Sequence, residues 1–168
     1  MSLAEHRDES PDRIAFAVLT FSDSRDSGSD RGGDFLVEVI EGAGHRVVHR
    51  ALYPDEGPRI AAAVRAAAAR DDVDLVLTTG GTGIAPRDVT YTTLLEVLDS
   101  QIPGFGELFR SLSHAEIGSA AILSRAIGGL VGDTVVLAMP GSPKALRLAM
   151  ESIVLPEAGH LVSQSRRS

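Results

Sequence analysis

The sequence IAFAVLTF at residues 14–21 is an unbroken apolar run with β-branched and aromatic side chains. Such a run is typical of a strand buried on both faces of a parallel sheet. A polar loop, SDSRDSGSDRGG, follows it. From Asp34 onward, apolar residues recur at helical spacing until Gly42 and Gly44, which favour a helix end. This order predicts a strand, a loop and a first helix.

Two further strands and a second helix come next along the chain. Residues 47–53 predict a second strand, and Pro58 begins a helix whose apolar residues recur at helical spacing. Residues 75–79 predict a third strand that runs directly into GGTG. Strands that alternate with helices at this spacing predict right-handed crossovers and an α/β sheet covered by helices on both faces.

The helices expected after the third strand have recognisable start signals. Asp88 or Thr90 is a candidate cap for one helix, and the Pro103-Gly104 break precedes another. Ser113 and Glu116 fit a capping box, which predicts the start of a further short helix.

The last two predicted strands form a hairpin. Residues 127–130 and 134–139 are separated by Val-Gly-Asp, which predicts one antiparallel strand. Ser142 and Pro143 then have the residue types of a helix cap and first helical position.

Composition and charge exclude several classes of function. The chain has 168 residues, with 16 Lys and Arg against 23 Asp and Glu, for a net charge of −7. A surface that binds nucleic acid is therefore not expected. The chain has no cysteine, which excludes disulfides, thiolate nucleophiles and cysteine-ligated metal sites and is typical of a cytoplasmic protein.

The domain organisation follows from where the apolar patterning begins and ends. Residues 1–13 are polar, with no apolar run that could act as a signal or a membrane span, and predict a flexible leader. Residues 14–162 predict a single domain. Residues 163–168 predict a short polar tail.

Chemistry is expected where the parallel strands end. In open α/β sheets, ligands bind beyond the carboxyl ends of the strands. That rule selects four loop segments, which are small, acidic or turn-forming: Ser22-Asp23, Pro54-Asp55-Glu56, Gly80-Gly81-Thr82-Gly83 and Pro140-Gly141-Ser142-Pro143-Lys144.

The segment TTGGTG, residues 78–83, is a candidate anion-binding turn. Without Cβ atoms its backbone can bend sharply and direct successive N–H groups at a phosphate. It matches neither the P-loop nor the dinucleotide fingerprint, because Ile84, Ala85 and Pro86 follow it. The alternative is a tight turn that serves packing alone.

Lys144 falls in the first turn of the last predicted helix. A cation there opposes the helix dipole by roughly 0.3–1 kcal/mol, and a bound anion would remove that conflict. The alternative is a solvated lysine whose charge is screened. A glycine-rich turn on the same edge of the sheet favours the phosphate hypothesis.

Asp55 and Asp88 would place negative charge beside the expected phosphate site, and this needs an explanation. Like charges ~4 Å apart repel by about 4 kcal/mol at an effective dielectric of ~20, so a bridging cation is needed. Mg²⁺ is commonly held by one or two carboxylates together with substrate phosphate oxygens. The alternatives are that Asp55 belongs to a Pro-Asp turn and that Asp88 caps a helix.

Four motifs in register carry a family resemblance. They are TTGGTGIAPRDVT (78–90), IPGFGELFR (102–110), ILSRA (122–126) and LAMPGSPKA (137–145). In this order and spacing they resemble the MoaB/MogA family of molybdenum cofactor biosynthesis proteins, closest to its MoaB branch, over residues 14–157. The resemblance implies a three-layer α/β/α sandwich with a mixed, mostly parallel five-stranded sheet.

The resemblance also implies a reaction. In characterised relatives, the terminal phosphate of molybdopterin attacks the α-phosphorus of ATP, giving adenylylated molybdopterin and pyrophosphate. Its two essential aspartates match Asp55 and Asp88, which are the expected catalytic and Mg²⁺-binding residues. The expected substrate- and nucleotide-binding residues are Ser22, Asp23, Thr79, Gly80, Gly81, Thr82, Gly83, Glu107, Ser124, Arg125, Pro140, Gly141, Ser142 and Lys144.

Two departures from the family pattern keep an alternative open. Tyr91-Thr92 stands where many relatives have Pro-Glu, and Gly32-Gly33 stands where a Ser-Gly is common. The alternative is a non-catalytic protein that binds or carries molybdopterin in the same pathway. The resemblance implies a homo-trimer or homo-hexamer, with molybdopterin, ATP and other proteins of the pathway as partners.

Overall fold

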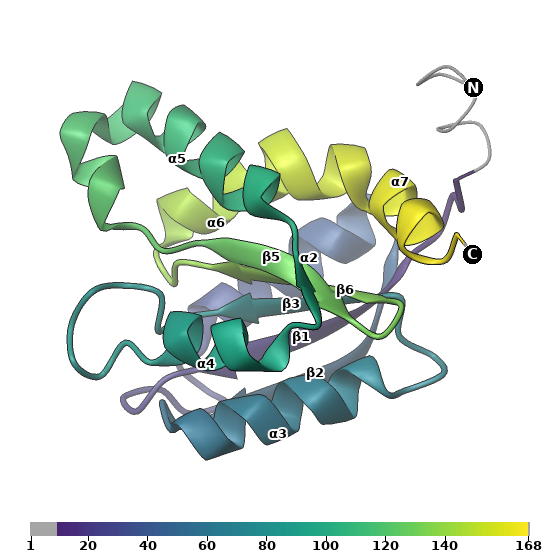
Figure 1. Ribbon diagram of the computed structural model, residues 1–168, viewed down its shortest axis with the longest axis horizontal. Coiled ribbons are helices and arrows are strands. Elements are labelled where there is room, and N and C mark those ends of the chain that lie inside the picture. Colours follow the sequence, from purple (N-terminus) through teal and green to yellow (C-terminus); the bar gives the residue numbers. More distant parts are fainter. Residues whose placement is uncertain (1–9, 168) are drawn as a thin grey trace.

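The computed structural model describes residues 10–167, which form a six-stranded sheet between two layers of helices (Figure 1). The strands lie in the order β2-β1-β3-β6-β5-β4. Their bounds are β1 (Ala15–Phe21), β2 (Arg46–Tyr53), β3 (Leu75–Thr79), β4 (Ser100–Gln101), β5 (Ile127–Val131) and β6 (Thr134–Met139). The first nine residues of the predicted leader lie outside the described residues.

The sheet is mixed, as predicted. Strands β2, β1, β3 and β6 are parallel, whereas β5 runs antiparallel to β6 and β4 antiparallel to β5. The predicted number of five strands is wrong because β4, an exposed strand of two residues, also pairs with β5. Ser100 and Gln101 are polar, so no apolar pattern marks this edge strand in the sequence.

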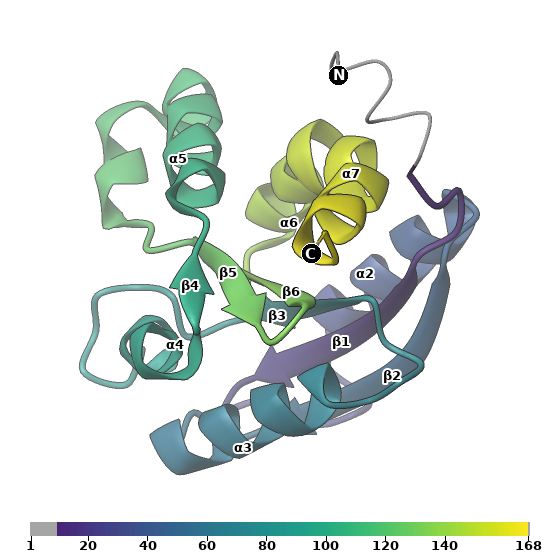
Figure 2. The same cartoon turned by 45° about the vertical axis from the view of Figure 1, so that its right-hand side comes forward.

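Helices cover both faces of the sheet, as Figure 2 shows. On one face lie α2 (Arg31–Gly42), α5 (Pro103–Ile117), α6 (Pro143–Ala149) and α7 (Leu155–Ser165), and on the other α3 (Gly57–Ala68) and α4 (Thr90–Val97). A 3₁₀ helix, η1 (Gly118–Leu123), follows α5, and a π-helical segment, η2 (Met150–Val154), joins α6 to α7. No helix within residues 10–167 has the length and apolar character needed to span a membrane.

The central strands explain the two-layered core. In β1, Phe16 and Val18 pack with the α2, α5, α6 and α7 layer, whereas Leu19 and Phe21 pack with α3 and α4. Every residue of β1 is buried, because adjacent side chains of a strand point to opposite faces and both faces are covered. The predicted doubly buried strand is therefore confirmed.

Helix ends show which local signals the structure uses. Ser142 caps α6 as predicted, with its side chain accepting from the N–H of Ala145. Gly44 adopts a φ of 88° after α2, also as expected for a glycine stop. The first helix begins at Arg31, earlier than the predicted Asp34, because buried Asp30 provides its cap.

Three expectations about helix ends are wrong. Neither Asp88 nor Thr90 caps α4, whose N-cap residue is Val89 with no side-chain hydrogen bond. Ser113 and Glu116 do not begin a new helix, because α5 continues through both to Ile117 and Ser113 is buried within it. At the C-terminus, α7 includes residues 163–165, which were predicted to be tail.

Candidate functional site

A polar cleft of about 260 Å³ lies where the four parallel strands end. It contains residues from the loop that follows each of these strands. The cleft lies at the switch point of the sheet, because β2 was added on one side of β1 and the next strand, β3, on the other. The lining residues are Phe21, Ser22, Arg25, Asp55, Gly80, Gly81, Thr82, Gly83, Asp88, Pro140 and Gly141. The structure thus brings together the four segments that the sequence selected.

The first two glycines of the turn after β3 are required by close approach. A Cβ on Gly80 would lie 2.2 Å from the carbonyl oxygen of Phe21 at the end of β1, and Gly80 has a φ of 99°. A Cβ on Gly81, whose φ is 65°, would lie 2.2 Å from Oγ1 of Thr90. Both positions exclude larger residues, so the turn packs against β1 and α4 while it lines the cleft.

Asp55 has an unusual environment for a carboxylate. Its Oδ1 atom is buried and has no hydrogen-bond partner among the described residues. Burial raises the pKa of Asp55 above its ordinary value, and the negative charges of Asp23 and Asp88 raise this pKa further. The charged form of Asp55 is therefore poorly compensated by protein groups alone, which leaves it available to a cation.

Asp88 also lies against the turn after β3. Its Oδ2 atom accepts a hydrogen bond from the backbone N–H of Ala85 at 2.9 Å. A Cβ on Gly83 would lie 2.6 Å from that oxygen, so glycine at this position leaves room for the carboxylate. Asp88 is thereby held by its own loop with its side chain at the cleft.

Asp23 connects three of the loops without lining the cleft. Its Oδ1 atom accepts from the backbone N–H of Asp55 at 3.0 Å, and its Oδ2 atom accepts from Nε of Arg87 at 2.9 Å. The hydrogen bonds from Arg87 and from the Asp55 backbone lower the pKa of Asp23 below its ordinary value. Asp23 is therefore an ionised support for Asp55.

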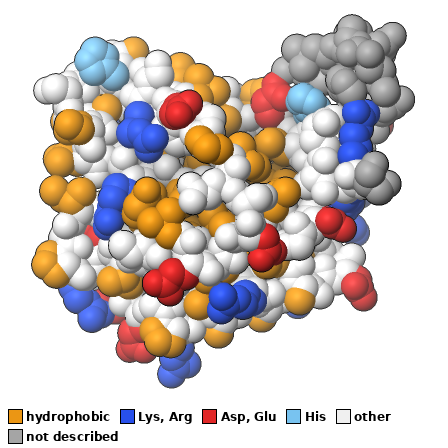
Figure 3. All heavy atoms as spheres, viewed as in Figure 1, with side chains coloured by type: hydrophobic (Ala, Val, Ile, Leu, Met, Phe, Trp, Pro, Cys, Tyr) orange, Lys and Arg blue, Asp and Glu red, His pale blue; other side chains and the backbone are white. Residues whose placement is uncertain are grey.

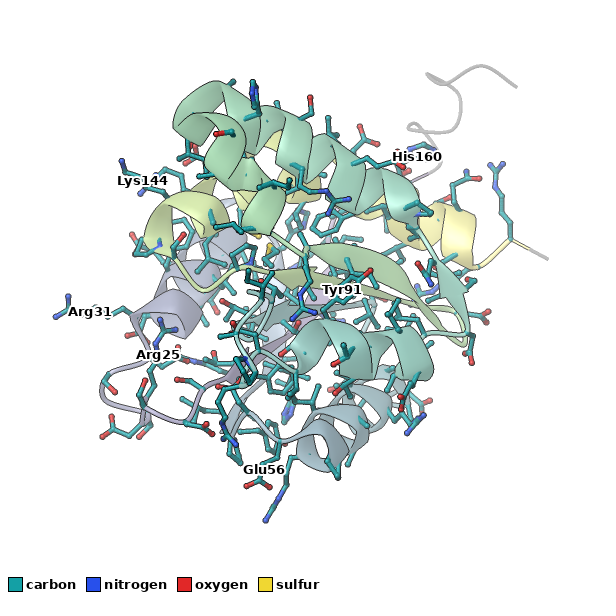
Figure 4. The ribbon with its side chains drawn as sticks, turned by 60° about the vertical axis from the view of Figure 1, so that its left-hand side comes forward. Arg25, Arg31, Glu56, Tyr91, Lys144 and His160 are labelled. Atoms are coloured by element: carbon teal, nitrogen blue, oxygen red, sulfur yellow. The ribbon has the colours of Figure 1, made fainter. Side chains whose placement is uncertain are left out.

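Cationic side chains lie in, or just after, the loops that follow β1 and β6. Arg25 lines the cleft and donates to the carbonyl of Gly141 at 3.4 Å. Figure 4 shows Arg25, with Arg31 at the start of α2 and Lys144 at the start of α6. Within the described part of the chain, these three side chains form no ion pair with a carboxylate. Their charges remain available to an anionic ligand.

The two carboxylates of the cleft, Asp55 and Asp88, limit the kind of metal site that can form there. Within residues 10–167 there is no group of three or more His, Cys, Asp or Glu side chains that could hold a metal ion. A cage of three or more such side chains is therefore absent from this region. Two hard carboxylates, one with an unpaired buried oxygen, fit Mg²⁺ that completes its coordination with phosphate oxygens and water.

An apolar groove adjoins the polar cleft. Its larger part, about 530 Å³, lies between α5 and α6 and is lined by Ser113, Glu116, Ile117, Ser142, Pro143, Lys144, Ala145 and Leu148. A smaller part of about 220 Å³ shares Ser142 and Ala145 with this groove and shares Thr82, Gly83 and Pro140 with the cleft. The polar and apolar regions are thus contiguous.

The predicted binding residues do not all meet at the cleft. Thr79 is fully buried in β3, and Glu107 lines a separate pocket of about 120 Å³ beside Tyr91 and Arg110. Ser124, Ser142 and Lys144 line the apolar groove instead of the cleft.

Arg125 also lies away from the cleft lining. Its guanidinium group lies behind the turn and donates to the carbonyl oxygens of Gly83 and Asp88. The sequence predicted that Arg125 binds substrate, but Arg125 is not among the residues that line the cleft.

Two cleft residues are absent from the sequence prediction. Phe21 ends β1 and Arg25 lies in the loop that follows it. Position alone could have suggested Arg25, because it is the first cation after a strand whose carboxyl end was expected to bind ligand. Its loop offers no spacing pattern that distinguishes it from Arg31.

The fold and the cleft define a class of three-layer α/β protein with a polar cleft at the carboxyl ends of its parallel strands. The chain belongs to the family described as "Probable molybdopterin binding domain", which matches residues 17–160. It is 46% identical over 168 residues to molybdenum cofactor biosynthesis protein B of Bacillus cereus, with 99% of each chain covered. The resemblance to the MoaB/MogA family is therefore confirmed, and it connects the chain with molybdenum cofactor biosynthesis.

Solved structures agree with this assignment. A crystal structure of a molybdenum cofactor biosynthesis protein B has a TM-score of 0.91 and 46% identity, covering 95% of this chain and 100% of that chain. The tungsten cofactor synthesizing protein MoaB from Pyrococcus furiosus has a TM-score of 0.83 and 31% identity, covering 94% and 100%. The predicted three-layer sandwich is confirmed by these neighbours.

Proposed function

We propose that this protein transfers an adenylyl group from ATP to the terminal phosphate of molybdopterin. The products are adenylylated molybdopterin and pyrophosphate. The observation that carries the proposal is the pair Asp55 and Asp88 in one glycine-lined cleft, where Asp55 has a buried, unpaired oxygen. Two carboxylates and the cationic side chain of Arg25 in one cleft suit a ligand that combines phosphates with a divalent cation.

The reaction needs positioning more than proton transfer. A phosphate monoester has a second pKa near 6, so the attacking oxygen is mostly ionised at neutral pH and needs no general base. That oxygen forms a bond to the α-phosphorus of ATP while the bond from this phosphorus to the bridging oxygen breaks and pyrophosphate leaves. The protein must align the two phosphates and compensate their charge.

The chain supplies these contributions from separate loops. Backbone N–H groups of the turn that contains Gly81 and Gly83 would bind phosphate oxygens, and Arg25 adds a positive charge at the same cleft. Asp55 and Asp88 would hold Mg²⁺, which when bound neutralises charge on the nucleotide phosphates. Asp23 keeps Asp55 in place through its backbone N–H.

The adjoining groove suits the aromatic part of a substrate. Its lining is mainly apolar, with Pro143, Ala145 and Leu148 from α6 facing Ile117 of α5. A planar heterocycle can bury its faces there while its phosphate reaches the cleft through the shared Thr82 and Gly83. The contiguous polar and apolar regions therefore support a ligand that joins a ring system to a phosphate.

A purified-protein assay tests the proposal. With molybdopterin, ATP and Mg²⁺, we expect release of pyrophosphate, measured by a coupled enzymatic assay. Removal of divalent cations with EDTA is expected to abolish release, and added Mg²⁺ is expected to restore it. Full activity without divalent cations would contradict the roles given to Asp55 and Asp88.

A non-catalytic molybdopterin carrier is the second candidate. Tyr91-Thr92, at the start of α4 directly after the loop of Asp88, favours it because the family more often has Pro-Glu there. Calorimetry distinguishes the two functions. A carrier is expected to bind molybdopterin but not Mg²⁺-ATP, whereas the transferase is expected to bind both.

We also propose that the protein assembles into a homo-trimer or homo-hexamer. Large hydrophobic side chains are exposed on the layer that contains α5 and η1, including Leu108, Ile117, Ile122 and Leu123. Figure 3 shows hydrophobic side chains gathering on the face where α5 and β5 lie. Light scattering coupled to size-exclusion chromatography tests this proposal, and a monomer at micromolar concentration would contradict it.

A further inference from the structure

Arg125 contacts the loop of Asp88 at three points. It lies between η1 and β5, and its Nε donates to the carbonyl oxygen of Gly83 at 2.8 Å. Its Nη2 donates to the carbonyl oxygen of Asp88 at 2.7 Å, and its backbone N–H donates to the carbonyl of Thr82 at 3.1 Å. One residue from a distant part of the chain therefore spans residues 82–88.

Tyr91 holds the other side of the same guanidinium group. The central carbon of the Arg125 guanidinium lies 5.1 Å from the centroid of the Tyr91 ring, within the range of a cation–π contact. Tyr91 is in the first turn of α4, directly after the loop (Figure 4). The planar group is thus fixed by hydrogen bonds in its plane and by an aromatic ring on its face.

Apart from backbone hydrogen bonds and the bond between Ala85 and Asp88, few contacts order the loop. Its residues 84–87 are exposed, and the α4 helix that follows it has no side-chain cap. The ion pair between Arg87 and Asp23 is solvent-exposed, and such pairs stabilise weakly. Within residues 10–167, Arg125 is the one side chain from outside the loop and α4 that donates hydrogen bonds to the loop backbone.

We infer that Arg125 and Tyr91 together are positioning residues that fix residues 83–88 and thereby hold Asp88 opposite Asp55. This inference rests on the proposed function for its effect on turnover. It replaces direct substrate binding by Arg125, since the Nε and Nη2 donors of its guanidinium are engaged by protein carbonyls. In this protein Tyr91 contributes to positioning the loop, although many family members have proline at that position.

Three variants test the inference in the full chain. Arg125→Lys keeps the charge but loses the planar guanidinium, whose separate Nε and Nη2 donors reach the two carbonyls. Tyr91→Leu removes the aromatic face, and Tyr91→Phe is the matched control that retains it. Amide hydrogen exchange of residues 83–89 in the ligand-free protein measures the order of the loop. Steady-state kinetics and the Mg²⁺ concentration for half-maximal turnover measure the effect on Asp88.

We expect Arg125→Lys to speed exchange in residues 83–89, to lower kcat by about 10–100-fold and to raise the Mg²⁺ requirement, because small displacements of catalytic groups are costly. Tyr91→Leu should change the same quantities by about 2–5-fold, and Tyr91→Phe should match the wild type. The double variant should be no worse than Arg125→Lys, because both changes remove one shared support.

Other results would overturn the inference. A rise in KM for ATP or molybdopterin with unchanged loop exchange in Arg125→Lys would show that Arg125 contacts substrate. Wild-type exchange and turnover in Tyr91→Leu would show that Tyr91 does not position the loop. If Arg125→Lys fails to fold, the result for Tyr91→Leu tests the positioning role by itself. If the wild type releases no pyrophosphate, the proposed function fails, while unchanged exchange in both variants separately refutes the positioning role.

Discussion

Two loops at the edge of the same cleft are built in different ways. The loop after β6, residues 140–142, is short and ends on Ser142, which caps α6 from its own sequence. The loop after β3, residues 80–89, is longer and leads into α4, which lacks a side-chain cap. Part of its order comes from hydrogen bonds with Met139, Thr90 and Arg125, which lie outside the loop.

The difference shows where the chain places its chemistry. The loop that needs distant support contains Asp88 and lies against Asp55, whereas the locally capped loop contributes backbone and small residues to the cleft. A long loop held by distant contacts can present a carboxylate at a fixed position without using it as a helix cap. A short loop that is capped by its own sequence needs no distant contacts, but it contributes fewer side chains to the cleft.

The largest expected effect is on turnover. Asp88→Asn should lower kcat by about 10²–10³-fold, comparable to loss of one electrostatic contact to a transition state. The amide oxygen of Asn can still accept from the N–H of Ala85, so the loop should stay folded. Pyrophosphate release and circular dichroism measure the two properties.

The matched control for that substitution is Asp72→Asn. Asp72 is an exposed aspartate whose hydrogen-bond partner is Arg70, remote from the cleft. It should leave kcat unchanged. Normal turnover in Asp88→Asn would remove Asp88 from the reaction.

The next effect is on stability and compares one glycine from each loop. Gly81→Ala should lower the free energy of unfolding by about 2–3 kcal/mol, because it places a Cβ at a φ of 65° and 2.2 Å from Oγ1 of Thr90. A Cβ on Gly141 would meet the Cα of Gly80 at 3.6 Å, an ordinary van der Waals distance, so Gly141→Ala should change stability by less than about 0.5 kcal/mol. Urea unfolding measures both, and equal losses would show that the two loops are equally constrained.

The same contrast explains what the sequence could predict. Ser142 and Pro143 predicted the start of α6 because a cap acts within one turn of helix. The four cleft segments could be predicted because strand order and direction bring carboxyl ends together. Local signals and topology were sufficient for these features.

The other features depend on contacts between residues far apart in the sequence. Arg125 lies 42 residues from Gly83, and no spacing pattern indicates that its guanidinium binds that carbonyl. Ser113 satisfied a capping box in sequence, yet tertiary packing buried it inside α5. The edge strand β4 has two polar residues, so only its pairing with β5 defines it.

A smaller effect tests the locally capped loop directly. Ser142→Ala removes the side chain that accepts from the N–H of Ala145, and should lower the free energy of unfolding by about 1 kcal/mol. Ser142→Asn should retain most of the stability, because asparagine caps about as well as serine. Thermal unfolding should show a decrease in Tm of roughly 2–4 °C for the alanine variant alone. Equal Tm values for the two variants would mean that the cap does not determine the stability of α6.

The smallest expected effect is on how the stability of the fold depends on pH. It concerns a third loop of the cleft, the loop after β1, which ends on Asp30, the cap residue of α2. Burial by itself raises the pKa of Asp30, but hydrogen bonds from Gly33, Thr20 and Arg50 outweigh it and hold this pKa below its ordinary value. The folded state then binds fewer protons than the unfolded state, so this carboxylate stabilises the fold above its ordinary pKa. That contribution is lost as the pH falls through the lowered pKa of the folded state. The difference in Tm between the wild type and Asp30→Asn should therefore be largest near neutral pH and shrink in the acid range, and a constant difference would show that Asp30 stabilises α2 without its charge.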